Sequence, residues 1–424
     1  MNRKRRGVSF GTVFMLCMVV LTLGGSAFVL TRLSGGGTVD LARLGATLQL
    51  DGEAPKQEVD DILIREEGKT AEKKPTVTKA PAENSEKNTF TLAVGGLAAI
   101  ETEVRRSCYS NDSKKYDFSD VFAALKPAFS ADLSCIFLEN ILSDDYKVST
   151  SVVPAAAADM LRGAGIQAAC CGWSKAWEKE GAGAESTRKA LEAAGIKALG
   201  LGGAGDIFEA NGIQVAMLQY TGTLSAATKK SLAKNGQEAM LPEAEMETIA
   251  AGIRDARSRG AGAVVILVNW GKDGKAPDKA QKALAQQIAD AGADLIIGAG
   301  SRIPQAPEVL KAAGTGREVL CVYSAGTLLS DNRKSAKRLG SYLLHVTFTG
   351  DGEGTAVSKV EYTPVYIWRY KQDGKFYYRC VAANGAAPDG MDSEQMKTME
   401  KAVAAVSDAL EGTSLTVRGA EAGR

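Results

Sequence analysis

The spacing of apolar and polar positions changes near residue 90, and the part that follows has the pattern of a folded domain. Short apolar runs bounded by Gly or Asp predict strands at 90–94, 133–138, 166–171, 213–220, 263–269, 295–298, 319–323 and 342–348. Between them, apolar residues at helical spacing predict helices at 117–129, 154–163, 185–194, 243–258, 277–291 and 307–311. This alternation predicts an α/β fold in which helices cover both faces of a sheet.

Beyond residue 348 apolar residues recur at every second position. Gly350-Asp351-Gly352 and Gln372-Asp373-Gly374 separate these runs as hairpin turns do, so we expect an antiparallel extension of the sheet up to Val381. A last helix is predicted from Asp392 to Leu410, because Asp392 and Gln395 have the spacing of a capping box. The pattern therefore predicts one domain at 89–385, followed by a helix and tail at 386–424.

The N-terminal residues have the composition of a membrane anchor. No charged residue occurs from Val8 to Leu30, a run long enough for a transmembrane helix. Four cationic residues precede it and only Arg32 closely follows it, which places the N-terminus in the cytoplasm and the bulk of the chain outside. We expect a basic tip and transmembrane helix at 1–33, with the span at 8–30, in a single-pass protein of the cell membrane. A cleaved signal peptide ending near Gly25-Ser26-Ala27 is the alternative.

Residues 34–88 differ from both of their neighbours. They are rich in Lys, Glu, Pro, Ala and Thr, and the stretch from Glu66 to Asn88 contains almost nothing apolar to bury. We therefore predict a disordered stalk between the membrane and the domain.

Composition narrows the possible chemistry. Lys and Arg together number 51 against 50 Asp and Glu, a net charge of +1 that disfavours a nucleic-acid partner. The single histidine, His345, lies in a predicted strand, where a core or cross-strand position is favoured over a ligand role. One imidazole cannot form a site with several histidine ligands. The sequence also contains no phosphate-binding loop, no nucleophile elbow and no Cys-x-x-Cys motif.

Six cysteines follow the predicted span: Cys108, Cys135, Cys170, Cys171, Cys321 and Cys380. An even number outside the cytoplasm permits disulfides. However, several lie inside apolar strand runs, and the adjacent Cys170 and Cys171 point to opposite faces of a strand. We therefore favour buried free thiols over disulfides or a redox role.

A set of short segments stands at the ends of the predicted strands: Tyr116–Leu138 followed by Glu139, Gly165-Ile166, Ala194-Gly195-Ile196 before Leu201-Gly202-Gly203, Asn211-Gly212-Ile213 with Tyr220-Thr221, Asn269-Trp270-Gly271, Ala291–Gly298, Gln305 and Tyr323-Ser324-Ala325-Gly326. In order and spacing, over about residues 90–370, these segments resemble the capsule-synthesis proteins of the CapA type. The domain of that family is related to calcineurin-like metallophosphoesterases. The resemblance implies a mixed-sheet α/β sandwich.

The resemblance fails where such proteins carry metal ligands. Members usually have Gly-Asp after the first strand, Asn-Leu-Glu after the second, Asn-Asn-His after the third, and then His-Trp-Gly and Gly-His-His-Pro-His, residue types that can hold metal ions. Here the corresponding positions read Gly95-Gly96, Phe137-Leu138-Glu139, Gly172-Trp173-Ser174, Asn269-Trp270-Gly271 and Gly298-Ala299-Gly300-Ser301-Arg302. Every expected imidazole is replaced. The resemblance therefore implies a degenerate member, a pseudoenzyme, with no catalytic residue and no cofactor.

Some polar groups survive at these positions. Glu139, Asn140 and Asn269 are weak candidates for an oxygen-ligand metal site that would take Ca²⁺ or Mg²⁺. Gly205-Asp206 repeats the lost motif before the wrong strand, and we interpret it as a turn.

Candidates for a ligand crevice are Trp173, Ser174, Trp270 and Arg302. Tryptophan rings can stack on sugars or on an aliphatic polymer, and Arg302 can bind a carboxylate. Alternatively, the tryptophans fill the volume left by the missing ligands, and Arg302 is a solvated loop residue.

The resemblance implies a membrane-anchored, non-catalytic accessory or binding component in the synthesis or export of a surface polymer of the poly-γ-glutamate type. Its expected partners are the membrane and either an anionic surface polymer or capsule-synthesis membrane proteins. The alternative is a metal-dependent hydrolase or transferase with a rebuilt oxygen-ligand site around Glu139. A third possibility is a sensor or scaffold whose ligand is unrelated to the capsule.

Overall fold

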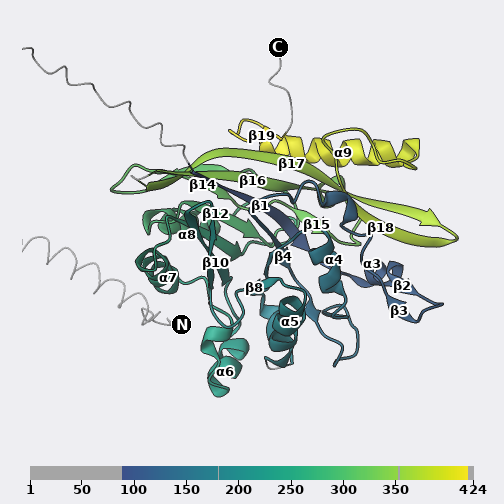
Figure 1. Ribbon diagram of the computed structural model, residues 1–424, viewed down its shortest axis with the longest axis horizontal. Helices are drawn as coiled ribbons and strands as arrows, with labels where there is room; N and C mark the ends of the chain where they lie inside the picture. Colours follow the sequence, from purple (N-terminus) through teal and green to yellow (C-terminus); the bar gives the residue numbers. More distant parts are fainter. Residues whose placement is uncertain (1–87, 180, 352–353, 419–424) are drawn as a thin grey trace, which may run out of the picture. The chain divides into compact units, whose positions relative to one another are not determined.

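The computed structural model describes residues 88–179, 181–351 and 354–418, all within one compact unit, Ala82–Arg424 (Figure 1). The predicted transmembrane helix at 8–30 and nearly all of the predicted stalk lie outside the described residues. In the part of the chain that is described, no helix is both long enough and apolar enough to cross a membrane.

The first sheet combines a parallel half and an antiparallel half. The order of its strands is β18 (Lys375–Ala382), β17 (Gly354–Gln372), β16 (Gly340–Asp351), β1 (Asn88–Ala98), β4 (Leu133–Leu138), β7 (Ala168–Cys170) and β8 (Lys197–Leu199), with β15 (Thr327–Leu329) beside β1 and β19 (Thr416–Val417) beside β17. Pairing is parallel from β1 to β8 and antiparallel from β1 to β18. The predicted antiparallel extension is therefore part of this sheet.

The second sheet has a parallel centre and antiparallel edges. The order of its strands is β13 (Glu308–Lys311), β14 (Glu318–Val322), β12 (Leu295–Ala299), β11 (Ala263–Asn269), β10 (Ile213–Thr221) and β9 (Gly205–Ala210). Only the outermost pairs, β9–β10 and β13–β14, are antiparallel. Two small ladders stand apart, one of β2 (Tyr109–Ser110) with β3 (Lys115–Tyr116) and one of β5 (Ile141–Leu142) with β6 (Val152–Val153).

The two sheets pack face to face, and helices cover their outer faces (Figure 1). The helices are α3 (Thr102–Ser107), α4 (Ala157–Gly163), α5 (Ala182–Ala193), α6 (Ala226–Lys234), α7 (Met246–Ser258), α8 (Lys279–Asp290) and α9 (Ser393–Leu410). Short 3-10 turns lie at Ala123–Leu125, Ser174–Trp177, Glu238–Met240 and Ala336–Arg338. Helices α4 and α5 cover the first sheet, α7 and α8 cover the second, and α9 lies along β16 and β17.

Successive side chains of a strand point to opposite faces of its sheet, and this alternation explains how the apolar layers form. In β10, Val215 and Met217 enter the apolar layer between the sheets, whereas Ala216 and Leu218 face α7 and α8. Most strands are buried on both faces, which is why the sequence shows continuous apolar runs rather than alternation. The mixed-sheet α/β sandwich predicted from the sequence is present, with two sheets in place of the single sheet that the alternation alone suggested.

Three local predictions are wrong. The helix predicted at 307–311 is instead strand β13, Glu308–Lys311, because these residues pair with β14 at the edge of the sheet. The segment 117–129 contains a 3-10 turn and no α-helix. Gly205 and Asp206 begin strand β9, where Asp206 is held by Lys197 and Arg259. The capping box of Asp392 and Gln395 is confirmed at the start of α9.

All six cysteines that follow the predicted span are buried, with free thiols. Desolvation raises the pKa of the Cys108 thiol to about 11, and it raises the pKa of Cys171 and Cys380 further. The prediction of buried thiols is confirmed, and protonated buried thiols are unreactive.

Candidate functional site

The carboxyl ends of the parallel strands of both sheets converge, and a cluster of charged side chains lies there. Glu101 follows β1, Glu139 follows β4 and Arg302 follows β12, while Lys175 lies in the 3-10 turn after β7. These residues line a cavity of about 210 Å³. The carboxyl ends of strands are where ligand sites of α/β proteins commonly lie.

Arg302 lies between two carboxylates. One guanidinium nitrogen contacts Glu139 Oε2, and the other lies 3.4 Å from Glu101 Oε1. Lys175 Nζ approaches the second oxygen of Glu139 to 2.5 Å. The Glu139 side chain is only 10% exposed, so both of its oxygens are engaged by the cations of the chain itself.

The backbone holds this cluster in place. Arg302 adopts a left-handed conformation with φ of 58°, and its carbonyl accepts a hydrogen bond from Thr327 Oγ1 at 2.9 Å. On the other side of the cluster, Glu101 Oε2 accepts hydrogen bonds from Ser330 Oγ at 2.7 Å and from the Asp331 N–H at 3.0 Å. The guanidinium is therefore directed at the carboxylates by its loop, and it is not a solvated loop arginine.

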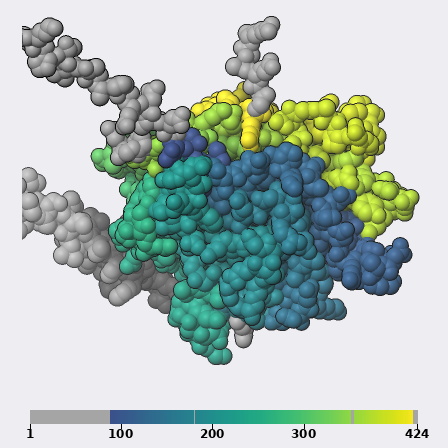
Figure 2. All heavy atoms as spheres, viewed as in Figure 1, coloured from purple at the N-terminus to yellow at the C-terminus, as the bar shows by residue number. Residues whose placement is uncertain are grey.

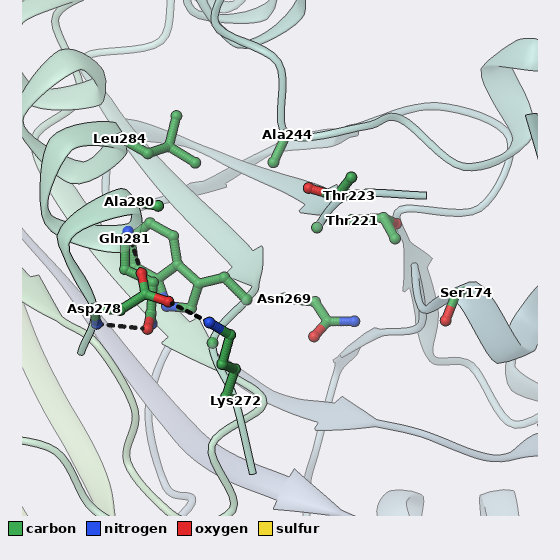
Figure 3. A pocket seen from close by; sticks show the side chains of 13 residues that line it. Ser174, Thr221, Thr223, Ala244, Asn269, Lys272, Asp278, Ala280, Gln281 and Leu284 are labelled. Atoms are coloured by element: carbon green, nitrogen blue, oxygen red, sulfur yellow. Dashed lines mark hydrogen bonds and ion pairs between the residues drawn. The ribbon is translucent and has the colours of Figure 1, made fainter. Parts of the chain in front are cut away.

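A larger crevice of about 410 Å³ lies next to the charge cluster, at the ends of β10 and β11 (Figure 3). Ser174, Thr221, Thr223, Asn269 and Lys272 contribute its polar groups, and Trp270, Ala280 and Leu284 contribute apolar surface. Lys272 pairs with Asp278, whose pKa is lowered by hydrogen bonding to the Gln281 N–H at the start of α8. The charges of the crevice are thus internally balanced.

Several polar groups of the crevice are free for a ligand. Thr221 Oγ1 donates to the Gly172 carbonyl at 2.6 Å. In contrast, none of the described residues hydrogen-bonds to the Asn269 amide or to the hydroxyls of Ser174 and Thr223. Figure 3 shows Asn269 between Ser174 and Lys272, with the Lys272 ammonium directed at Asp278. Amide and hydroxyl groups in this arrangement can bind an uncharged polar group such as an amide bond.

The two tryptophans of the predicted crevice are largely buried. Trp173 packs against Phe137 between the sheets, and its indole N–H donates to the Cys170 carbonyl at 3.3 Å. Trp270 packs against Tyr323 and donates to the Tyr323 carbonyl at 3.0 Å, although one side of its ring reaches the crevice. At Gly298, a Cβ would lie 2.1 Å from the indole nitrogen of Trp270. Trp173 therefore fills volume between the sheets, whereas Trp270 is part of the core and also lines the crevice.

The weak metal candidates are not brought together as a ligand set. The Asn140 amide is buried and spans two loops, accepting from the Ile100 N–H at 2.7 Å and donating to the Ile100 carbonyl at 3.2 Å. Asn269 lines the crevice, whereas Glu139 and Asn140 line the smaller cavity. Over the described ranges, no three His, Cys, Asp or Glu side chains are grouped as metal ligands. The residues at these positions do not fit the set of metal ligands that members of the resembled family usually carry.

Sequence reasoning found part of this site. It identified Glu139, Asn269 and the position of Arg302, but it missed Lys175 and the contribution of Glu101. The signal for Lys175 was its place directly after Trp173-Ser174, at the end of a buried strand. Lys272, Gln281 and Thr223 belong to no sequence motif. They line one crevice only because the fold brings α8 to the end of β10.

Comparisons with known proteins identify a family and two curated relatives of similar sequence. The family model for the bacterial capsule synthesis protein PGA_cap matches residues 91–332. The chain is 28% identical over 159 residues to the capsule biosynthesis protein CapA of Bacillus anthracis, covering 35% of this chain and 37% of that protein. It is 30% identical over 161 residues to the PGA biosynthesis protein CapA of Bacillus subtilis, covering 37% of this chain and 40% of that protein. The matched segments thus span about two fifths of these relatives.

Two solved structures are also similar. One is a hypothetical protein from Thermus thermophilus, at 11% identity and a TM-score of 0.39 over 65% of this chain and 98% of that one. The other is a novel phosphatase from Mycoplasma pneumoniae, at 13% identity and a TM-score of 0.37 over 66% of this chain and 94% of that one.

Proposed function

The chain belongs to the bacterial capsule synthesis protein PGA_cap family, and from this premise we propose that it is a non-catalytic, membrane-anchored accessory protein. It acts outside the cytoplasm by binding a surface polymer during synthesis or export. By analogy with the relatives named for capsule and PGA biosynthesis, the polymer is of the poly-γ-glutamate type.

The observation that carries the non-catalytic role is the position of Arg302. A metal-dependent hydrolase needs carboxylates that are free to bind a cation. Here a guanidinium that is 19% exposed already lies between Glu101 and Glu139, and Lys175 occupies the remaining oxygen of Glu139. A divalent ion would have to displace two cations, one of which is directed inward by its own backbone. We infer that the chain's own cations take the place that metal ions hold in an active relative.

The crevice next to this cluster supports a binding role. Poly-γ-glutamate presents amide bonds separated by short aliphatic segments. The amide of Asn269 and the hydroxyls of Ser174 and Thr223 can pair with such amide bonds, while Trp270 and Leu284 offer apolar contact. Lys272, whose side chain is 77% exposed, can turn from Asp278 to a carboxylate of the polymer.

The anchor is proposed from the sequence alone. The uncharged run at 8–30 and the cationic residues before it favour a single span with the domain outside. Fractionation of cells that express the full chain should recover it in the membrane, resistant to extraction by salt. Release of a chain shortened near Ala27 would support the signal-peptide alternative instead.

Polymer binding is tested with the full chain and purified poly-γ-glutamate in isothermal titration. Asn269→Ala and Ser174→Ala should each weaken binding about threefold to tenfold, because each removes a free hydrogen-bonding group. Asn235→Ala, at the exposed residue that follows α6, is the matched control and should not change it.

The hydrolase or transferase alternative makes a different prediction. Polymer shortening or phosphoester hydrolysis by the wild-type chain, abolished by Glu139→Ala, would overturn the non-catalytic role. Equal binding by wild type and both crevice variants would instead show that the polymer does not occupy this crevice.

A further inference from the structure

A second recess of about 580 Å³ lies away from the strand-end site and shares none of its lining residues. We call it the aromatic groove. One wall is formed by the end of α3 and the β2–β3 ladder, and the other by the β17–β18 hairpin. Figures 1 and 2 show these two parts side by side at one edge of the molecule. The groove is lined by four tyrosines and by Ser, Asn, Asp and Lys side chains: Tyr109, Tyr370, Tyr377, Tyr378, Ser107, Ser110, Ser119, Asn111, Asp112, Asp117, Asp120 and Lys375.

Hydrogen bonds and an ion pair fix the two walls to each other. Lys375 Nζ donates to the Tyr109 carbonyl at 2.7 Å. Arg379 pairs with Asp120 at 2.5 Å, and the Cys380 N–H donates to the Val121 carbonyl at 2.8 Å. A groove held in this way loses little conformational freedom when a ligand enters it.

The charges of the groove disfavour two classes of ligand. Three aspartates line it against one lysine, and hydrogen bonding to Ser119 lowers the pKa of Asp117. Arg379 neutralises Asp120 from beside the groove, and the small negative charge that remains disfavours an anionic polymer. A cationic ligand is disfavoured because the chain's own cations already lie over the rings. Lys375 lies 5.0 Å from the ring centroid of Tyr377, and Arg379 lies 5.4 Å from that of Tyr370.

The remaining chemistry is that of a neutral polyhydroxylated ligand. A sugar ring has an apolar face that packs on an aromatic ring and a rim of hydroxyls that need both donors and acceptors. Tyr370 and Tyr377 are stacked on each other, with centroids 5.6 Å apart. Tyr109, on the opposite wall, packs at a tilt against Tyr116 with centroids 5.0 Å apart, but it is only half-buried and lines the groove, so part of its ring can contact a sugar. The exposed Asp112 carboxylate can accept hydrogen bonds from sugar hydroxyls.

We propose that the aromatic groove binds a neutral glycan chain. This function goes beyond the polymer binding proposed for the strand-end crevice and does not depend on it. A protein with both sites would hold a capsule polymer at the crevice and attach to a neutral polysaccharide at the groove.

The test is titration of the full chain with three neutral tetrasaccharides, N-acetylchitotetraose, cellotetraose and maltotetraose. We expect saturable binding of at least one at up to millimolar concentration. Tyr109→Ala should weaken it about tenfold or more, whereas Tyr109→Phe, which keeps the ring, should stay within about threefold of wild type. Asp112→Asn should weaken it about threefold or more through loss of a charged acceptor.

Two control variants lie outside the groove. Tyr146→Ala and Asp145→Asn are on an exposed loop and should leave binding unchanged. Because Asp112 is exposed, its substitution leaves the fold intact even if Tyr109→Ala does not. The proposal is overturned if none of the three tetrasaccharides binds, or if binding is the same in wild type, Tyr109→Ala and Asp112→Asn. Binding of choline or poly-γ-glutamate that Tyr109→Ala abolishes would also overturn it.

Discussion

Two carboxylates in this protein have nearly the same surroundings and serve different ends. Glu139, at the carboxyl ends of the strands, and Asp294, before β12 at their amino ends, each have a side chain that is 10% exposed and two cationic partners. Asp294 pairs with Arg257 at 2.5 Å and with Arg317 at 2.6 Å. By charge and burial alone, the two clusters could not be told apart.

The difference lies in what else the partners bind. Asp294 accepts the Val264 N–H at 2.6 Å, and Arg257 donates to the carbonyls of Gly262 and Gly292. This cluster joins α7 to the starts of two strands. The Glu139 side chain bonds only to other side chains, and its partners line a cavity. Among the carboxylates of that cluster, Glu101 accepts one backbone N–H, that of Asp331. We therefore interpret the Asp294 cluster as part of the fold, and the Glu139 cluster, which faces a cavity, as a former or present site.

The largest effect should come from breaking the backbone-tied cluster. Asp294→Ala leaves two arginines facing each other at the sheet edge and removes an acceptor from Val264, so we expect a loss of about 3 kcal/mol of stability. Glu139→Ala should cost about 1–2 kcal/mol, since Arg302 keeps Glu101. Urea denaturation measures both. Equal losses would show that the backbone contacts do not distinguish the clusters.

A third buried cluster extends the comparison to pH. His345 lies between Thr363 Oγ1 at 2.9 Å and Arg418 Nη1 at 2.8 Å, and it ties the C-terminal strand β19 to the sheet. Burial and the Arg418 charge lower its pKa to about 4.

The folded pKa of His345 is below that of the unfolded chain, so the unfolded state binds more protons as the pH falls from about 6.5 towards 4. Stability should drop by about 2 kcal/mol between pH 7 and pH 5. His345→Asn should flatten this part of the profile, because the chain has no other histidine. An unchanged slope in the variant would assign the pH dependence to carboxylates.

Removing one arginine from each cluster sharpens the contrast. Arg302→Ala frees one oxygen of Glu101 and one of Glu139, both at a cavity, and we expect the variant to gain Mn²⁺ or Ca²⁺ affinity. Added cation should then raise its Tm by roughly 2–4 °C for each kcal/mol of binding. Arg317→Ala should gain none, because it frees only Oδ1 of Asp294, while Oδ2 stays bonded to Arg257 and to the Val264 N–H. A cation response in both variants, or in neither, would contradict the distinction.

The smallest effect should come from Lys175. Its side chain is 47% exposed, and exposed ion pairs contribute little to stability. Lys175→Ala should change the free energy of unfolding by less than about 1 kcal/mol. A larger loss in urea denaturation would mean that Lys175 holds the 3-10 turn and not only Glu139.

The sequence predicted the strands of the core well, because buried parallel strands are continuous apolar runs such as Ala263–Asn269. It failed at sheet edges. Residues 307–311 and Gly205–Asp206 have local patterns of a helix and a turn, and only pairing with β14 and β10 makes them strands. Strand order, and therefore the presence of two sheets, depends on contacts between residues far apart in the sequence. The periodicity of apolar residues does not predict such contacts.

For the site, the sequence indicated which residues lie at the strand ends but not which of them contact one another. Glu139 and Arg302 are 163 residues apart, and their contact follows from the convergence of β4 and β12 at one edge. From the sequence, the two tryptophans could either stack on a ligand or fill the volume left by the missing metal ligands. Their buried indole hydrogen bonds favour the second role. The aromatic groove could not be predicted from the sequence, because its two walls lie more than 250 residues apart in the chain.

The central claim is that the chain's own cations occupy the place of metal ions. Elemental mass spectrometry of the full chain, purified without chelator, tests it directly, with Glu139→Ala beside it. We predict far less than one metal ion per chain, unchanged by added Mn²⁺, Ca²⁺ or Zn²⁺ and the same in the variant. Close to one ion per chain that disappears in Glu139→Ala would contradict the account and support a metal-dependent enzyme.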